Sequence, residues 1–141
     1  MKQKETTRTQ SRYDRIAPLY DLMEAPIERL AFSDWREKVW SLVRGPKILE
    51  LGVGTGKNMP YYPENVQVTG VDLSPQMLAR ARRRAQKLGV EVDLRQMDAQ
   101  KLEFPDATFD TALATFVFCS VPDPVVGLRE LGRVVKPGGR I

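Results

Sequence analysis

The spacing of hydrophobic residues changes near residue 45 and divides the chain into two parts. Before this point, hydrophobic residues recur at intervals of three and four over residues 11–43, which predicts helices. Pro18 and Pro26 are expected to break the pattern into short pieces, followed by a longer helix that ends near Arg44. Residues 1–10 are polar and are expected to be disordered. The residues that carry the helical pattern are Ile16, Leu19, Tyr20, Met23, Ile27, Leu30, Ala31, Trp35, Val39 and Leu42.

Beyond residue 45, short hydrophobic runs alternate with amphipathic segments. Strands are expected at residues 47–51, 67–71, 90–96 and 109–115, helices at 56–62, 74–88 and 125–134, and a turn at 136–139. Strands that alternate with helices predict an α/β domain with a parallel sheet. We therefore divide the chain into a basic N-terminal arm with helices, residues 1–44, and an α/β domain, residues 45–141.

The helix expected at residues 74–88 carries recognisable signals at both ends. Ser74 is placed to cap its N-terminus, and Pro75 occupies the first helical position. Gly89 follows its last residue, where a left-handed conformation commonly ends a helix. These signals also locate the turn that joins the second expected strand to this helix.

Composition limits the class of protein. The chain has 141 residues, of which 42% are hydrophobic, enough for one domain with a core. It has one cysteine, Cys119, and no histidine, so an intrachain disulfide is excluded and no metal site is expected. No hydrophobic run is long enough to span a bilayer, and the polar N-terminus does not resemble a secretory signal. A cytoplasmic protein is expected.

The net charge of +4 arises from two local clusters of basic residues. One cluster occupies the first 15 residues, and the other lies at residues 80–87. Solvated surfaces are one interpretation of such clusters. Attraction to an anionic partner, either nucleic acid or lipid, is the other.

The stretch ELGVGTG, residues 50–56, places three alternating glycines directly after an expected strand. Glycine allows positive φ angles and close approach of the backbone to a ligand. Backbone N–H groups at the start of a following helix would be directed at that ligand. A tight turn between strand and helix with no ligand is the alternative.

Two aspartates follow the next two expected strands. Asp72 ends the second strand, twenty residues after Gly52, where a carboxylate accepts hydrogen bonds from the hydroxyls of a ribose. Its alternative role is an acid ahead of the helix start. Asp98, just past the third strand, would lie at the same edge of the sheet and accept a hydrogen bond from an adenine amine, while Ala99 offers a backbone N–H. An adenosine ligand is predicted.

Two details argue against a dinucleotide. The glycine spacing is G-x-G-x-G, whereas the motif that holds a pyrophosphate is G-x-G-x-x-G. Glu50 would also repel an anionic ligand at this turn. A carboxylate beside backbone N–H groups suits the amino and carboxylate groups of the methionine end of S-adenosylmethionine. We expect Glu50 to bind the amino group through water and the glycine amides to bind the carboxylate.

Four motifs in this order resemble the class I S-adenosylmethionine-dependent methyltransferases of type 11. They are ELGVGTG (50–56), VTGVDLSPQML (68–78), QMDAQKLEFPDATFD (96–110) and ELGRVVKPGGR (130–140). The resemblance implies a Rossmann-like parallel sheet of order 3-2-1-4-5-7-6, with S-adenosylhomocysteine as the product. It also implies these cofactor-binding residues: Glu50, Gly52, Gly54 and Gly56 at the methionine portion, Asp72 and Leu73 at the ribose, Asp98, Ala99, Met77 and Met97 at the adenine, and Phe116 after the fourth strand. For Met77, core packing is an alternative role.

The N-terminal segment narrows the resemblance. RYDRIAPLYDLME, residues 12–24, is similar to the opening of bacterial phosphatidylethanolamine N-methyltransferases and of quinone-biosynthesis methyltransferases. In those families the segment forms a lid over the cofactor, and its second tyrosine, here Tyr20, lies near the transferred methyl group. Tyrosines that merely pack on an amphipathic helix are the alternative. FVFCSVPDP, residues 116–124, resembles both the phospholipid-type and the thiol- or alkyl-modifying methyltransferases, and together with residues 56–78 it favours the phospholipid group. A basic arm suits docking on an anionic membrane.

The resemblance leaves several functions open. Methylation of the amine of phosphatidylethanolamine is expected, with a quinone precursor or another small molecule as the alternative acceptor. A cofactor-binding module without turnover is a third reading, and a dehydrogenase is disfavoured by the glycine spacing. Nucleic-acid methylation is not expected, since no N-P-P-Y tetrad follows the fourth strand.

Methyl transfer from a sulfonium needs alignment and exclusion of water more than covalent catalysis. With no histidine in the chain, the commonest general base is missing. We assign Tyr20 to orienting the acceptor, with Tyr13 and Asp21 as further groups that reach its proton through water. No catalytic base is assigned.

The end of the sequence, KPGGRI, falls where a fifth strand is expected to begin. We expect the domain to be truncated before this strand is complete, which leaves residues 109–115 at or near an edge of the sheet. An unpaired hydrophobic edge invites pairing with another chain. A homo-oligomer formed through this edge is therefore expected.

Overall fold

The computed structural model describes residues 2–27 and 32–141. Two helices, α1 (Lys2–Ile27) and α2 (Ser33–Ser41), precede the α/β domain. The elements of that domain are β1 (Lys47–Leu51), the short 3₁₀ helix η2 (Met59–Tyr61), β2 (Gln67–Asp72), α3 (Pro75–Leu88), β3 (Asp93–Gln96), β4 (Phe109–Ala114), α4 (Pro124–Val134) and β5 (Val135–Arg140). The expected class, an α/β domain preceded by helices, is confirmed.

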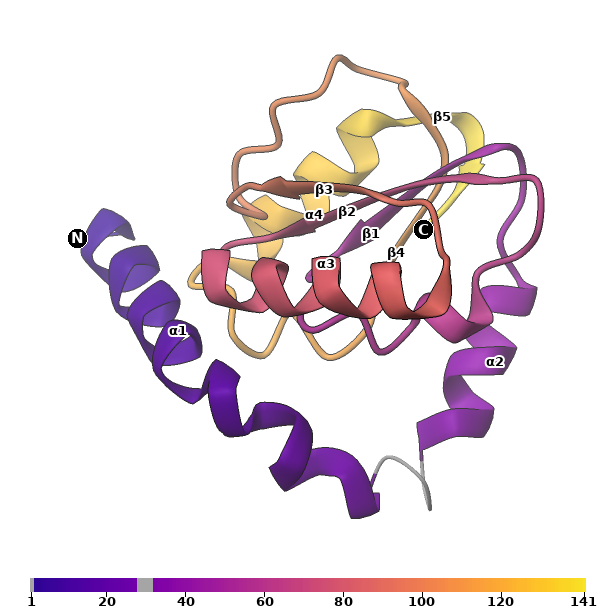
Figure 1. The fold of residues 1–141 in the computed structure, drawn as a ribbon. Coiled ribbons are helices and arrows are strands. Elements are labelled where there is room, and N and C mark those ends of the chain that lie inside the picture. The colour runs from indigo at the N-terminus through magenta and orange to yellow at the C-terminus, as the bar shows by residue number, and fades with distance from the viewer. Residues whose placement is uncertain (1, 28–31) are drawn as a thin grey trace.

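The five strands form one parallel sheet in the order β3-β2-β1-β4-β5 (Figure 1). This is the first part of the expected class I order. The chain moves outward from β1 to β3 and then crosses back to β4, so β1 and β4 are neighbours at the point where the winding direction reverses. Ligands of open α/β sheets bind outside the carboxyl ends of the strands at such a point.

Helices cover both faces of this sheet, so its central strands are buried on both sides. On one face, Leu49 and Leu51 of β1 pack in a hydrophobic cluster with Leu131 of α4. On the other face, Ile48 packs with Trp40 of α2. Successive side chains of a strand point to opposite faces, which places Glu50 on the same face as Ile48.

The expected signals of α3 are confirmed. The Oγ atom of Ser74 accepts a hydrogen bond from the backbone N–H of Met77 at 3.1 Å, and Pro75 is the first helical residue. Gly89 has a φ angle of 67° and ends the helix in the left-handed conformation. The turn after β2 is thereby fixed at the edge of the sheet where the expected ligand would bind.

The N-terminal helices differ from the expectation. Residues 2–10 are helical, and Pro18 and Pro26 do not end α1, which runs as one helix from Lys2 to Ile27. Contacts with the α/β domain explain the helix, since Ala17 is buried and Thr6 reaches Asp98. α2 ends at Ser41 instead of near residue 44. The expected pattern positions Leu30 and Ala31, and the side chains of Asp21, Met23 and Ile27, lie outside the described residues.

The α/β domain differs from the expectation mainly at its end. Residues 135–140, where a turn and an incomplete strand were expected, form β5 beside β4. β4 therefore has a strand on each side and is not a sheet edge, so the premise of the expected homo-oligomer is wrong. Val135 is buried in the α4 cluster, and Lys136 pairs with Asp110 at 2.6 Å, which holds β5 in place. The short helix expected at residues 56–62 is a turn followed by η2.

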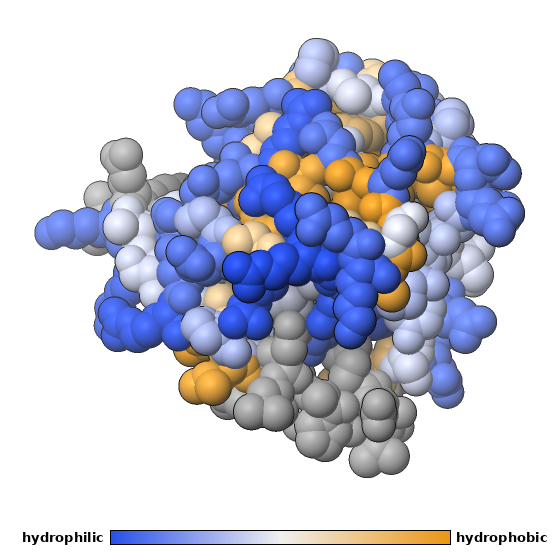
Figure 2. Space-filling view, in the orientation of Figure 1, coloured by the Kyte–Doolittle hydropathy of each residue, from blue (hydrophilic) through white to orange (hydrophobic). Residues whose placement is uncertain are grey.

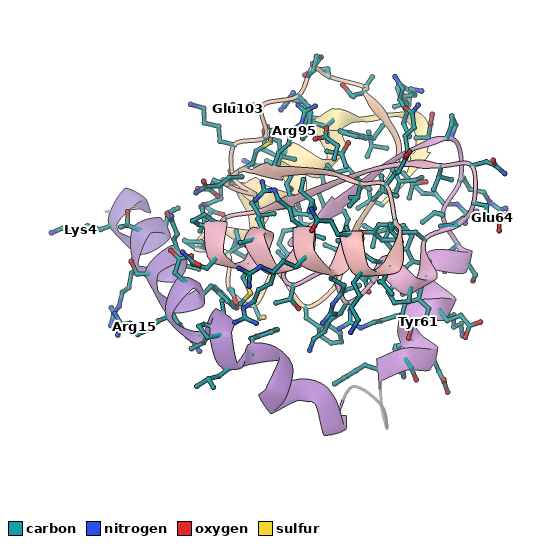
Figure 3. The ribbon with its side chains drawn as sticks, viewed as in Figure 1. Lys4, Arg15, Tyr61, Glu64, Arg95 and Glu103 are labelled. Carbon is teal, nitrogen blue, oxygen red and sulfur yellow. The ribbon has the colours of Figure 1, made fainter. Side chains whose placement is uncertain are left out.

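Hydrophilic residues predominate on the face of the molecule shown in Figure 2, with hydrophobic residues visible between them. Lys4 and Arg15 point away from the α/β domain (Figure 3). On α3, Arg82, Arg83 and Lys87 are exposed. Within the described residues, no helix is long and apolar enough to cross a membrane.

Candidate functional site

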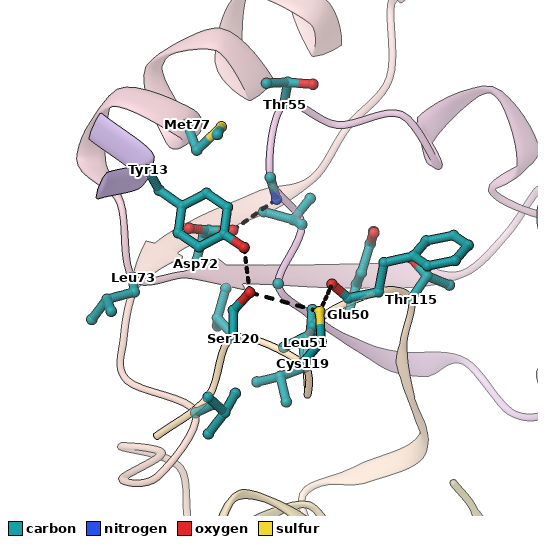
Figure 4. A pocket seen from close by; sticks show the side chains of 18 of the residues that line it. Tyr13, Glu50, Leu51, Thr55, Asp72, Leu73, Met77, Thr115, Cys119 and Ser120 are labelled. Atoms are coloured by element: carbon teal, nitrogen blue, oxygen red, sulfur yellow. Dashed lines mark hydrogen bonds between the residues drawn. The ribbon is translucent and has the colours of Figure 1, made fainter. Parts of the chain in front are cut away.

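A cavity of about 510 Å³ lies at the carboxyl ends of β1, β2, β3 and β4, at the predicted position. This volume is in the range of small-molecule sites. Its walls are the turns that follow these strands, together with residues of α1 and the start of α2. In Figure 4, Asp72 and Tyr13 lie at one side, and Glu50 and Thr115 lie at the other. Of the twelve residues predicted at the site, all but Gly56 line this cavity.

The glycine turn after β1 has positive φ angles at all three glycines, 69° at Gly52, 55° at Gly54 and 82° at Gly56. A Cβ atom at Gly52 would lie 1.9 Å from Cγ2 of Val117, so packing within the protein excludes a side chain there. At Gly54, by contrast, the nearest atom to a Cβ would be the carbonyl oxygen of Gly52, at 4.0 Å. The space that a Cβ atom would take at Gly54 is thus free of protein atoms, and Gly54 lines the cavity.

The amides of these glycines are used within the protein. The N–H of Gly52 donates to the carbonyl oxygen of Val71 at 2.8 Å, and that of Gly56 donates to Val53 at 2.9 Å. The N–H of Gly54 donates to Oδ2 of Asp72 at 2.9 Å. The expectation that these three N–H groups bind a ligand carboxylate therefore disagrees with the structure, because each already has an acceptor.

Asp72 is fixed by the two turns that it joins. Its Oδ2 atom accepts the N–H of Gly54, and its Oδ1 atom accepts the N–H of Ser74 at 2.9 Å. Each carboxylate oxygen has two lone pairs, so both oxygens keep one for a ligand hydroxyl. Burial raises the pKa of Asp72, and the negative charge of Asp14 raises it further, while hydrogen bonds from the backbone N–H groups, Ser74 first among them, lower it.

Asp98 and Ala99 lie on the cavity wall after β3, as expected. Oδ1 of Asp98 accepts the backbone N–H of Gln100 at 2.9 Å, which orients the carboxylate. Oδ2 is 3.4 Å from the hydroxyl of Thr6, which donates to it from α1. The predicted adenine end of the cavity is therefore closed on one side by the start of α1, which the sequence predicted to be disordered.

Glu50 is almost fully buried, at 1% exposure, and is hydrogen-bonded at both oxygens. Oε1 accepts from Nδ2 of Asn58 at 2.7 Å, and Oε2 accepts from the hydroxyl of Tyr62. Burial raises the pKa of Glu50 to about 7, although the hydrogen bonds and the positive charge of Arg36 lower it. The carboxylate at this end of the cavity is thus close to its protonation midpoint at neutral pH.

The other predicted side chains fall into two groups. Met77 is buried and Met97 is partly buried; both line the cavity, and Met97 also packs against the α4 cluster. Leu73 lines the cavity beside them. Phe116 is 62% exposed, has a φ angle of 59°, and meets the ring of Phe32 edge-on at 4.9 Å between centroids. Its exposed ring forms part of the cavity rim.

Helix α1 forms the remaining wall. Tyr13 and Tyr20 both line the cavity, and Nζ of Lys57 lies 5.0 Å from the centroid of the Tyr20 ring. The hydroxyl of Tyr13 is hydrogen-bonded to Ser120, beside Cys119 (Figure 4). As expected for a continuous helix, the two tyrosines lie on the same face of α1. Their roles as lid and acceptor-orienting residues stay predictions.

Sequence reasoning missed three residues of the Glu50 surroundings. Arg36 is 7% exposed on α2, Asn58 lies in the glycine turn, and Tyr62 follows η2. Nothing in the periodicity marks Arg36, because charged residues surround it in SDWREKVWS. Asn58 and Tyr62 come eight and twelve residues after Glu50, and only the fold shows that the turn brings them back.

Comparison with known protein families identifies the family of this chain. The family model described as "Methyltransferase domain" matches residues 49–141. The chain belongs to this methyltransferase domain family.

Within the described residues, no group of three or more His, Cys, Asp or Glu side chains is placed to hold a metal ion.

Two curated relatives differ in how much of the chain they match. A phosphatidylethanolamine N-methyltransferase of Cereibacter sphaeroides is 49% identical over 100 residues, which cover 70% of this chain and 49% of the relative. A demethylmenaquinone methyltransferase of Thermus thermophilus is 39% identical and covers 92% of this chain and 61% of the relative. The chain thus spans 49% and 61% of the length of these two relatives.

Two solved structures share the fold. The [4+2]-cyclase SpnF is 26% identical, with a TM-score of 0.80 over 95% of this chain and 57% of its own. A SAM-dependent methyltransferase from Thermotoga maritima, described as a possible histamine N-methyltransferase, is 31% identical, with a TM-score of 0.73 over 90% of this chain and 56% of its own. The fold therefore hosts more than one chemistry, and function has to be argued from the site.

Proposed function

We propose that the cavity binds S-adenosylmethionine and that the chain is the cofactor-binding part of a methyltransferase. The observation that carries the proposal is the placement of three carboxylates, Glu50, Asp72 and Asp98, around one cavity at the reversal point of the sheet. Each suits one part of the cofactor: the amino group, the ribose hydroxyls and the adenine amine. A metal is not needed in this proposal.

The residues present fit this cofactor. Asp72 keeps acceptor capacity on both oxygens, and the open space at Gly54 lets a ligand approach the backbone. Met77 and Met97 line the same cavity as Asp98 and supply apolar surface for the adenine ring. With the three glycine amides already paired, the carboxylate of the methionine portion must bind to other donors at the rim, of which Lys57 carries a positive charge.

When bound, the cofactor supplies an activated methyl group on a sulfonium. The chain contributes binding, orientation and exclusion of water. Tyr13, Tyr20, Phe32 and Phe116 place aromatic side chains around the cavity, which limits access of water to it. Tyr20 orients the acceptor in this proposal, and no residue is assigned as catalytic base.

For the acceptor we propose the amine of phosphatidylethanolamine. The 49% identity with the phosphatidylethanolamine N-methyltransferase of Cereibacter sphaeroides supports this choice. The basic residues of α1, of which Lys4 and Arg15 point away from the domain, suit peripheral contact with an anionic membrane at the cytoplasmic face.

A demethylated menaquinone is the second candidate acceptor. It is favoured by the match to demethylmenaquinone methyltransferases, such as that of Thermus thermophilus, which covers 92% of this chain and so includes most of the N-terminal helices. Aromatic side chains around the cavity, Tyr20 and Phe116 among them, also suit a planar quinol ring.

Transfer of a labelled methyl group separates the two acceptors. The chain is incubated with methyl-labelled S-adenosylmethionine and vesicles that contain either phosphatidylethanolamine or demethylmenaquinol, and the lipids are extracted and counted. Label in phosphatidylethanolamine alone supports the first candidate, and label in the quinol alone replaces it with the second. Cofactor binding without label in either lipid would favour a binding module without turnover.

A further inference from the structure

A chain of buried polar side chains connects α2 to Glu50 on β1. Nη1 of Arg36 donates to Oδ1 of Asn58 at 2.7 Å, and Nδ2 of Asn58 donates to Oε1 of Glu50 at 2.7 Å. Arg36 is 7% exposed, Asn58 is 2% exposed, and all three residues line the cavity. A cation from the N-terminal helices therefore reaches the carboxylate of the α/β domain through a single amide group.

The amide of Asn58 can face only one way in this arrangement. Its oxygen accepts from the guanidinium, and its nitrogen donates to the carboxylate. Reversal would place N–H groups against the guanidinium and two oxygens against each other. Oγ1 of Thr115 accepts from Asn58 at 3.0 Å and from Arg36 at 3.4 Å, which holds the amide in this orientation.

The charge of Glu50 depends on these neighbours. The charged and titratable groups that face it are Arg36 from α2, Tyr62 after η2 and Asp72 from the end of β2. Burial and Asp72 raise the pKa of Glu50, while Tyr62, Asn58 and Arg36 lower it, and the balance lies at about 7. Removing the positive charge of Arg36 therefore shifts the carboxyl group toward its neutral form.

We propose that Arg36 and Asn58 are positioning residues that keep the carboxylate of Glu50 ionised and directed at the amino group of the cofactor. The inference rests on the proposed function, since it assigns Glu50 to that amino group. Arg36 acts through Asn58 and Glu50 and is not assigned a contact with the reacting atoms. It follows that α2 belongs to the cofactor site, although it precedes the segment that matches the methyltransferase domain.

The dependence of cofactor affinity on pH tests this inference. Binding of S-adenosylhomocysteine to the whole chain is measured by calorimetry between pH 5.5 and 8.5 for the wild type, Arg36→Met and Arg36→Lys. Wild-type affinity should fall as the pH drops below about 7, because a neutral Glu50 attracts the ammonium group less. In Arg36→Met the fall should begin roughly one pH unit higher, and Arg36→Lys should restore most of the wild-type profile.

Two further variants keep the test decisive. Lys38→Met removes an exposed cation from the same helix and should leave the profile unchanged. Arg36→Gln removes the charge but keeps a polar side chain, so it reports the loss of charge if Arg36→Met fails to fold by circular dichroism. An affinity that drops equally at every pH in Arg36→Gln, with an unmoved midpoint, would overturn the inference. Absence of binding by the wild type would instead overturn the proposed function.

Discussion

At the scale of single residues, burial affects the pKa values of Glu50 and Asp72 more than their hydrogen bonds do. Glu50 has two hydrogen-bond donors and a nearby guanidinium, yet burial still raises its pKa to about 7. Asp72 accepts two turn N–H groups and its pKa is raised as well. Keeping such a buried acid ionised destabilises the ligand-free protein, and binding of a cationic ligand restores the lost stability.

Replacement of Glu50 by Gln should stabilise the ligand-free protein above neutral pH. The pKa of Glu50 is higher in the folded chain, about 7, than its ordinary value of 4.5, so its contribution to stability is present below pH 4.5 and is lost as the pH rises through 7. The loss amounts to about 3 kcal/mol. Thermal denaturation should give Glu50→Gln a melting temperature several degrees above the wild type at pH 8 and nearly equal to it at pH 5. A lower melting temperature than the wild type at pH 8 would contradict this account.

Two glycine variants should separate packing from ligand access. Gly52→Ala places a methyl group 1.9 Å from Val117 at a positive φ angle, so the variant should lose more than ~3 kcal/mol of stability or fail to fold. Gly54→Ala has the positive φ angle but no such clash and should lose only about 1–2 kcal/mol. Denaturant unfolding and calorimetry with S-adenosylhomocysteine measure both effects. A folded Gly54→Ala that binds as tightly as the wild type would show that the ligand does not approach this glycine.

The three-glycine turn shows how far a sequence motif can be interpreted alone. The motif correctly located the cavity and the positive φ angles. It did not show that Val71, Val53 and Asp72 accept hydrogen bonds from the three amides, because those acceptors depend on how β1 pairs with β2 and on how the turn itself folds. The roles of the glycines therefore divide into packing at Gly52 and open approach at Gly54.

At the scale of elements, α1 is the segment in which sequence and structure differ most. Its first ten residues are polar and predict disorder by themselves, and Pro18 predicts a break. The structure is helical there because Thr6, Tyr13 and Asp14 bind partners on three different turns of the α/β domain. Such tertiary contacts leave no periodic signal in a single sequence, whereas the strands and α3 carry their signals locally.

Loss of Asp14 should loosen this helix. Its Oδ1 atom accepts from the hydroxyl of Ser74 at 2.5 Å and lies 3.4 Å from the backbone nitrogen of Gln76, at the N-terminus of α3. Asp14→Ala should therefore speed dissociation of S-adenosylhomocysteine roughly 3- to 30-fold, which corresponds to the 0.7–2 kcal/mol typical of one such hydrogen bond. Stopped-flow fluorescence measures the rate. The exposed neighbour Arg15 provides the control, Arg15→Ala, and equal rates in the two variants would mean that α1 is not a lid.

At the scale of the whole molecule, β4 lies inside the sheet, whereas the sequence predicted it at or near an edge. β4 is paired on both sides, and the outer strands are β3 and β5. Asp93 and Arg95 are exposed charged residues on β3, and β5 contains Pro137 and two glycines. Charged side chains and proline are common means of preventing edge-to-edge association.

The chain should therefore be monomeric in solution. With β4 covered by β5, neither outer strand offers a hydrophobic edge for pairing with a second copy. Sedimentation velocity at about 10 μM, far above the concentration at which nanomolar association would saturate, should give the mass of one chain. A stable dimer would show that some other surface, outside the sheet edges, mediates association.

The proposed function requires one cavity that holds an adenosine with a cationic amino-acid end. Calorimetry with S-adenosylhomocysteine on the wild type, Asp72→Ala and the exposed control Asp93→Ala tests it most directly. The wild type and Asp93→Ala should bind alike, and Asp72→Ala should lose roughly 2–4 kcal/mol of binding free energy, because two hydrogen bonds to a charged acceptor are removed. Unchanged affinity in Asp72→Ala, or no binding by the folded wild type, would contradict it.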